Sequence, residues 1–163
     1  MKDVFIGIGS NVDREANITS CINELRNVFS NLEISPVYET SSMGFEGPNF
    51  FNLVCKFSTD EELLNLKKML NKIEIDHGRT FGEEKFSSRT LDIDILYYED
   101  LIFESDEIKL PRDEITRYDF VLKPLVDIAP DFVHPVKQLT NKRILAEHEI
   151  EKLIIKKIEL RLK

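Results

Sequence analysis

The chain has 163 residues, of which 42% are hydrophobic and 32% charged, so it can bury the core of one ordinary domain. Its net charge of −8 and its pI near 5.0 argue against a general nucleic-acid-binding or anionic-membrane surface. The apolar run at the N-terminus is too short for a signal peptide, and no segment has the length of a membrane span. We therefore expect one domain over residues 1–163, a cytoplasmic location, no nucleic-acid or membrane partner, and a monomer.

Apolar periodicity and turn residues give the following predicted elements in chain order. They are a strand over 3–11, a helix over 17–30, a strand over 32–40, a strand over 50–58, a helix from 63 to about 78 and a strand over 91–96. A capping box at 59–62 is expected to open the second helix, and Gly78 to end it. The order β-α-β-β-α-β predicts a ferredoxin-like α+β sandwich.

The remainder of the chain predicts a C-terminal extension of short strands and helices. Residues 101–115 suggest short strands and a turn, residues 118–130 hold one short helix, and a last helix begins near Thr140. The tail over 157–163 alternates apolar and charged residues, as a strand does. A frayed or packed end is the favoured interpretation, and an added edge strand or a dimer contact is the alternative.

The cysteines and histidines show no pattern of a reactive or metal-binding site. Cys21 and Cys55 fall on the apolar sides of a predicted helix and a predicted strand, which predicts buried free thiols rather than a disulfide or a nucleophile. The histidines are His77, His134 and His148, and they lack ligand spacing. No Ser/His/Asp or Cys/His set can be assembled.

An acidic pair stands in the stretch "RTLDIDIL", where apolar and acidic residues alternate with a period of two. On a strand, Asp92 and Asp94 point to one face and Ile93 to the other. Adjacent carboxylates raise each other's cost of ionisation, so the pair favours a bound cation or proton. Mg²⁺ prefers such oxygen ligands, although on spacing alone a solvated strand face is the commoner interpretation of D-x-D.

Cationic residues surround the acidic pair in the sequence. They are Arg79, Lys85, Arg89, Arg112 and Arg117. Each taken alone is best interpreted as a surface residue. Together, beside a metal-binding pair in an acidic protein, they favour an anionic substrate such as a polyphosphate.

Two aromatic residues stand where a core residue is not expected. Phe50 and Asn52 share the polar face of the third strand, where an aromatic ring beside an amide suits a flat heterocyclic ligand. The alternative is that Phe50 lies under a loop and that Asn52 is exposed. Phe86, within the charged loop over 79–88, is typical of a lid that closes over a ligand.

These motifs together resemble a known family. "FIGIGSN", "GPNFFNLV", "IEIDHGR", "RTLDIDIL" and "FVLKPLVDIAP", in this order between Val4 and Pro130, are similar to the 6-hydroxymethyl-7,8-dihydropterin pyrophosphokinases of the folate pathway. The resemblance implies a ferredoxin-like fold and transfer of pyrophosphate from ATP to the hydroxymethyl group of the pterin, with release of AMP. It also implies that ATP is the co-substrate and that two Mg²⁺ ions are bound.

The resemblance assigns roles residue by residue. It implies metal ligands at Asp92 and Asp94 and catalytic phosphate contacts at Arg79 and Arg89. It implies a pterin pocket at Thr40, Met43, Phe50, Asn52, Phe86 and Phe120. It implies an ATP site at Glu74, Lys85, Arg89, Ile95 (through its backbone) and Arg112.

The sequence departs from the family pattern on the ATP side. Arg112 follows Pro111 where relatives commonly have His, and we expect Arg112 to replace it as a phosphate donor. Tyr118 stands where a basic residue is common, and Arg117 lies one position earlier. Phe81 stands where another Arg often occurs.

Two other functions were weighed. A non-catalytic ligand-binding module on the same fold would leave the acidic pair and its cations unexplained. Another Mg²⁺-dependent phosphoryl or nucleotidyl transferase is the nearer alternative, and the residues of the implied pterin pocket count against it.

Overall fold

The computed structural model describes residues 1–42, 45–78 and 89–162. Its elements are β1 (Lys2–Ser10), α1 (Arg14–Val28), β2 (Glu33–Ile34), β3 (Val37–Thr40), β4 (Phe50–Thr59), α2 (Leu63–Asp76), β5 (Asp92–Tyr98), β6 (Phe103–Glu104), β7 (Lys109–Leu110), the 3₁₀ helix η1 (Asp113–Thr116), α3 (Asp119–Ile128), α4 (Asn141–Glu147) and β8 (Ile154–Ile158). None of the helices in these ranges is long and apolar enough to cross a lipid bilayer.

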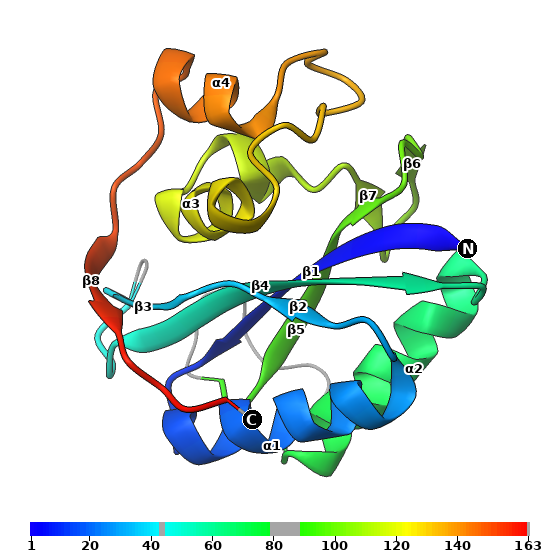
Figure 1. The fold of residues 1–163 in the computed structure, drawn as a ribbon. Coiled ribbons are helices and arrows are strands. Elements are labelled where there is room, and N and C mark those ends of the chain that lie inside the picture. The colour runs from blue at the N-terminus through cyan, green and yellow to red at the C-terminus, as the bar shows by residue number, and fades with distance from the viewer. Residues whose placement is uncertain (43–44, 79–88, 163) are drawn as a thin grey trace.

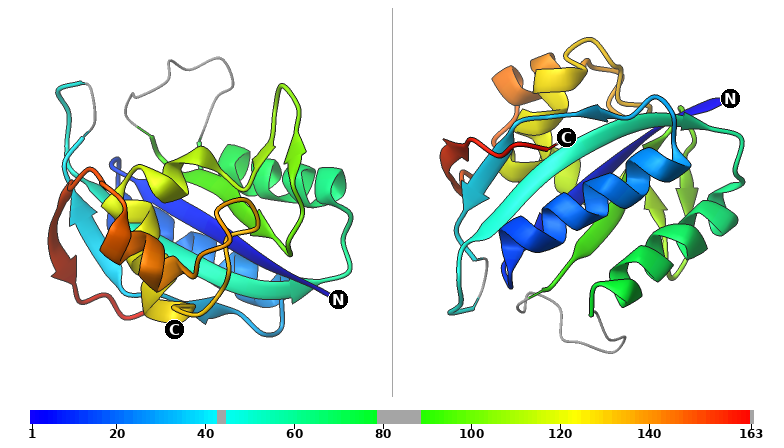
Figure 2. Two further views of the ribbon diagram at one scale, coloured as in Figure 1. Left: turned by 90° about the horizontal axis from the view of Figure 1, so that it is seen from above. Right: turned by 60° about the horizontal axis from the view of Figure 1, so that its bottom comes forward.

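The main sheet is antiparallel and has the strand order β5-β1-β4-β3-β8, with the short β2 also paired to β4. Helices α1 and α2 cover one face of this sheet, and α3 and α4 cover the other, so the fold has three layers (Figures 1 and 2). The elements from β1 to β5 follow the predicted order, except that the single strand predicted over 32–40 is divided into β2 and β3, and the ferredoxin-like prediction is confirmed. A two-stranded β6-β7 sheet and helices α3 and α4 form the predicted extension.

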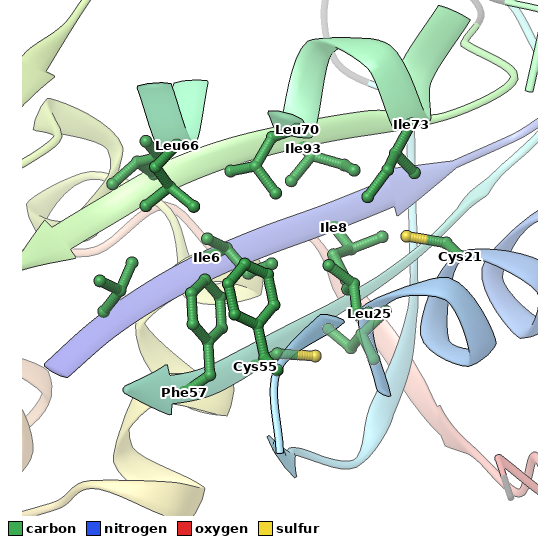
Figure 3. Packing of buried hydrophobic residues seen from close by; sticks show 14 of the residues in the cluster. Ile6, Ile8, Cys21, Leu25, Cys55, Phe57, Leu66, Leu70, Ile73 and Ile93 are labelled. Carbon is green, nitrogen blue, oxygen red and sulfur yellow. The ribbon is translucent and has the colours of Figure 1, made fainter. Parts of the chain in front are cut away.

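Two hydrophobic cores lie on the two faces of the sheet, because the strands alternate side chains between the faces. One core packs Ile6 and Ile8 of β1 against α1 and α2 (Figure 3). The other packs Phe5 of β1 against α3 and α4. Cys21 and Cys55 are free and buried in the first core, as predicted, and burial raises the pKa of both thiols.

The second helix begins differently from the prediction. Glu62 is the N-cap residue of α2 and makes no side-chain capping bond. Thr59 still belongs to strand β4, and its hydroxyl accepts the Glu61 N–H at 3.1 Å. Thr59 is therefore not the N-cap residue of α2, and the predicted capping box is wrong. The predicted end of the helix is confirmed, since Gly78 follows α2 with a φ of 91°, which favours glycine.

The tail combines the two interpretations. Residues 154–158 form β8, an edge strand that pairs with β3, as in the alternative, and the residues after β8 form the packed end that was favoured. The edge strand forms because β3 would otherwise present an unpaired row of backbone groups to water. Beyond β8, Leu160 and Leu162 pack against the core beneath the sheet.

Helix α2 offers a direct test of the core. Leu66 is fully buried and Leu64, on the same helix, is 60% exposed. Leu66→Ala should lower the free energy of unfolding by about 2–5 kcal/mol through the cavity it leaves, and Leu64→Ala by about 0.5 kcal/mol or less. Urea unfolding followed by circular dichroism measures both. Equal losses in the two variants would contradict the packing described for α2.

Candidate active site

A cavity of about 280 Å³ opens between the sheet and the segment over 112–121. Its sheet side is built by β1, β4 and β5, and its other wall by the residues around η1 and the start of α3. This cavity is therefore the place where residues predicted to bind metal, phosphate and pterin can lie close together.

The floor of the cavity is set by the register of three strands. On β1, Gly9 lies between Asp92 of β5 and Asn52 of β4, and Gly7 lies between Asp94 and Val54. A Cβ atom at Gly9 would stand 2.5 Å from the Asn52 side-chain oxygen, so any larger residue would displace that amide. The alternation I-G-I-G thus buries isoleucines in the core and leaves the opposite face open.

The acidic side of the cavity holds both aspartates. The Asp94 carboxylate lies 3.6 Å from the Arg112 guanidinium, which is also paired with Glu114. The pKa of Asp94 is raised to about 7, mainly by burial and also by the adjacent Asp92, while Arg112 opposes the rise. An ionised Asp94 is therefore costly in the metal-free protein, and a cation would relieve that cost.

The acidic pair also has support from beneath the sheet. The Glu74 carboxylate, 2% exposed at the end of α2, accepts the backbone N–H of Ile93 at 2.8 Å. Ile93 stands between the two aspartates, so this bond fixes the edge strand that carries them. Glu74 and Ile95 were both predicted to belong to the ATP site. The Ile95 side chain is buried in the core, and neither residue lines the cavity.

The side of the cavity next to Arg89 is shaped by the turn after β1. The Asn11 side chain accepts the Arg89 backbone N–H at 2.7 Å, and the Asn11 backbone N–H donates to the Arg89 carbonyl at 3.0 Å. The Ser10 hydroxyl donates to the Thr90 carbonyl at 2.6 Å. These bonds hold Arg89, which is 8% exposed, at the cavity wall.

The aromatic side lies across the floor from the acidic pair. The Asn52 amide donates to the Thr40 hydroxyl at 2.7 Å, which orients its carbonyl group away from Thr40. Phe50 meets Phe45 edge to face, with ring centroids 6.3 Å apart. Phe120 stacks on Tyr118 at 5.3 Å and lines the opposite wall. Flat aromatic surfaces around a fixed amide suit a planar heterocycle.

Most of the predicted site residues come together in this cavity. Those that line it are Thr40, Phe50, Asn52, Arg89, Asp92, Asp94, Arg112 and Phe120. Arg117, one of the cationic residues that surround the acidic pair in the sequence, lines it as well. The predictions for Met43, Arg79, Lys85 and Phe86 lie outside the described residues.

Several lining residues were not predicted as site residues. Gly7, Gly9 and Ser41 line the cavity, and so do Glu114 and Tyr118. Glycine alternating with isoleucine in a strand is a signal of close approach that would have identified Gly7 and Gly9. Glu114 and Ser41 carry no such signal, because only the fold brings their turns to the cavity.

The donor set of the acidic pair fits a magnesium ion. In the part of the chain that the structure describes, no cluster of three or more His, Cys, Asp or Glu side chains is placed to hold a metal. Two carboxylates that share one face suit Mg²⁺, which commonly binds one or two protein carboxylates and takes its other ligands from water and substrate phosphates.

Comparisons with known proteins agree with this arrangement. The family model for 7,8-dihydro-6-hydroxymethylpterin-pyrophosphokinase matches residues 5–130. The 2-amino-4-hydroxy-6-hydroxymethyldihydropteridine pyrophosphokinase of Aquifex aeolicus is 34% identical over 153 residues, which are 93% of this chain and 95% of that enzyme. The folic acid synthesis protein FOL1 of Dictyostelium discoideum is 38% identical over 145 residues, but this chain spans only 22% of its length.

A solved structure shares the fold. The wild-type HPPK-DHPS of Plasmodium falciparum superposes with a TM-score of 0.68 at 14% identity, over 90% of this chain and 41% of that one. The family model covers most of the chain, and the Aquifex enzyme is matched over nearly its whole length. The chain therefore belongs to the 7,8-dihydro-6-hydroxymethylpterin-pyrophosphokinase family.

Proposed function

We propose that this chain transfers the pyrophosphoryl group of ATP to the hydroxymethyl group of 6-hydroxymethyl-7,8-dihydropterin, with release of AMP, as a step of folate synthesis. Its membership in the family supports the reaction. The observation that supports the proposal for this chain is that one cavity holds the Asp92–Asp94 pair, three arginines and the Phe50–Asn52 pocket. Metal-bound polyphosphate and a flat acceptor need such a shared space.

The proposed reaction is an in-line displacement at the β-phosphorus of ATP. The pterin hydroxyl oxygen forms the new bond, the bond from the β-phosphorus to the α,β-bridging oxygen breaks, AMP leaves and the hydroxyl proton is released. Arg89 and Arg112 would bind the phosphate oxygens, and Phe50 and Asn52 would hold the pterin with its hydroxyl toward them. Positioning and charge stabilisation supply most of the catalysis in such transfers.

Asp92 and Asp94 would hold the magnesium. We propose two ions, as the family resemblance implies, each completing its coordination with phosphate oxygens and water. When bound, Mg²⁺ neutralises the charge that develops on the transferring phosphates. The protein's own part is to keep two carboxylates on one strand face, with Glu74 bonded to the strand between them.

The remaining assignments complete the proposal. Thr40 and Phe120 belong to the pterin pocket, and Arg79 and Lys85 to the phosphate contacts, with Met43 and Phe86 on the pterin side. Glu74 and the Ile95 backbone contribute to the nucleotide site. We further propose that residues 1–163 form one pyrophosphokinase domain that acts as a cytoplasmic monomer without nucleic-acid partners.

The nature of the products tests the proposed function. With ATP, Mg²⁺ and 6-hydroxymethyl-7,8-dihydropterin, the chain should form AMP and the pyrophosphorylated pterin in equal amounts, and a chelator should stop both. Asp94→Ala should lower kcat by at least about a hundredfold, because the variant lacks one ligand of the metal ion that stabilises the transition-state charge. Asp100→Ala, an exposed aspartate just after β5, should leave kcat unchanged. Formation of ADP, or near-normal turnover of Asp94→Ala, would refute the proposal.

Arg89 separates catalysis from pterin binding. Arg89→Ala should lower kcat by at least about a hundredfold and change the pterin Kd by less than about threefold, because the guanidinium acts on the phosphate side. Arg89→Lys should recover only part of the loss, since lysine keeps the charge without the fork of donors. Steady-state kinetics and pterin titration measure the two effects. Equal damage to both would indicate that Arg89 is structural.

In the absence of metal, ionisation of the Asp94 carboxyl group should destabilise the folded protein measurably. The pKa of this group is about 7 in the folded chain, above its ordinary value of 3.8, so the folded state holds the proton more tightly. Stability from this group is present below about pH 4 and is lost as pH rises through 7. In chelator at pH 8, Asp94→Asn should therefore raise Tm by about 2–4 °C, the shift that 1 kcal/mol gives a domain of this size.

The same comparison at pH 4 is the control for that prediction. There the parent Asp94 is protonated and the two proteins should melt together. Thermal unfolding at the two pH values, in chelator throughout, decides the matter. A variant that melts below the parent at pH 8 would show that Asp94 is not a destabilising charge.

A further inference from the structure

The C-terminal segment over 151–158, here called the tail segment, lies beyond residue 130, where the family match ends. Figure 1 shows the chain descending from α4 to place β8 beside β3. This route carries the tail segment past both the start of α3 and the end of β3, which carry the cavity-lining residues Phe120 and Thr40.

The tail segment is bonded to the cavity wall at its first residues. The Glu151 backbone N–H donates to the Arg117 carbonyl at 2.7 Å, and the Asp119 N–H donates to the Glu151 carbonyl at 3.0 Å. These two bonds form a parallel bridge between Tyr118 and Glu151. Tyr118 stacks on Phe120, so the bridge fixes the backbone that presents both rings.

Asp119 adds a side-chain clamp to this bridge. One oxygen of its carboxylate accepts the Leu153 N–H at 2.9 Å, and the other accepts the Ile154 N–H at 3.2 Å. Bonds from backbone N–H groups to an ionised carboxylate are stronger than those between neutral groups. The start of α3 is therefore fixed to the tail segment through two atoms of one side chain.

The tail segment is bonded to the end of β3 at the same residues. The Leu153 carbonyl accepts the Ser41 N–H at 3.1 Å, and Ile154 pairs with Thr40. Two residues further along β8, the Lys156 ammonium lies 3.8 Å from the Glu39 carboxylate, which also accepts from Arg14 at 3.1 Å. Leu153 thus bonds Asp119, which stands between the lining residues Tyr118 and Phe120, on one side, and the lining residue Ser41 on the other.

We propose that Asp119 is a positioning residue, which holds the Tyr118–Phe120 wall against the Thr40–Ser41 wall through the tail segment and so preorganises the pterin pocket. Asp119 does not line the cavity, and it acts through the residues on either side of it. The proposal rests on the proposed function only for the identity of the ligand. Preorganised walls bind more tightly because they need no ordering when the ligand arrives.

The test compares pterin and nucleotide binding in Asp119→Ala, Asp119→Asn and Glu151→Ala. The Glu151 side chain is exposed, and its backbone bonds survive the change, so Glu151→Ala is the matched control. Asp119→Ala should raise the Kd for 6-hydroxymethyl-7,8-dihydropterin about tenfold and leave that for a non-hydrolysable ATP analogue within about twofold. Asp119→Asn, which keeps one acceptor oxygen, should lie between parent and alanine, and Glu151→Ala should match the parent.

Hydrogen exchange in the ligand-free protein gives a readout that does not depend on the reaction. In Asp119→Ala the amides of Ser41 and of Leu153 and Ile154 should exchange faster, while those of β1 and β5 should not change. Equal weakening of pterin and nucleotide binding, or an unchanged pterin Kd, would overturn the proposal. A parent protein that binds no pterin while these amides still respond would instead refute the proposed function and leave the clamp standing.

Discussion

The site depends on one constraint, the alternation of isoleucine and glycine in β1. Ile6 and Ile8 bury their side chains in the core, while Gly7 and Gly9 present none to the opposite face. Because β1 is the strand between β4 and β5, the absence of side chains there joins two half-sites into one cavity. A side chain at Gly9 would displace the Asn52 amide, so the strand that anchors the core also sets the shape of the pocket.

The electrostatic design follows from this geometry. An acidic chain is a poor general binder of phosphates, and it concentrates opposite charges at one place instead. Asp92 and Asp94 share a face and disfavour each other's ionisation, and the Arg112 guanidinium beside Asp94 offsets only part of that cost. Ionisation of both carboxylates is therefore unfavourable within this fold, and a bound cation would offset that cost.

Much of the fold and site was predictable from local patterns, and the rest was not, for physical reasons. Period-two alternation identified the β5 face, and the position of Phe50 and Asn52 on the polar side of β4 identified the pocket. The capping box failed because strand pairing kept Thr59 extended, and the pairing of β8 with β3 was not the favoured interpretation because it is a long-range contact. The bond of Glu74 to the Ile93 backbone could not be predicted either, because it depends on how α2 packs against the sheet and no local sequence pattern indicates it.

The central claim is that one cavity holds the metal-binding pair and the pterin pocket side by side. Its most direct test is the paramagnetic effect of Mn²⁺, used in place of Mg²⁺ with a non-hydrolysable ATP analogue, on the proton resonances of bound 6-hydroxymethyl-7,8-dihydropterin. We predict strong broadening of the hydroxymethyl protons in the parent and its loss in Asp94→Ala. Pterin that binds the parent without broadening would place metal and acceptor in separate sites and would contradict the account.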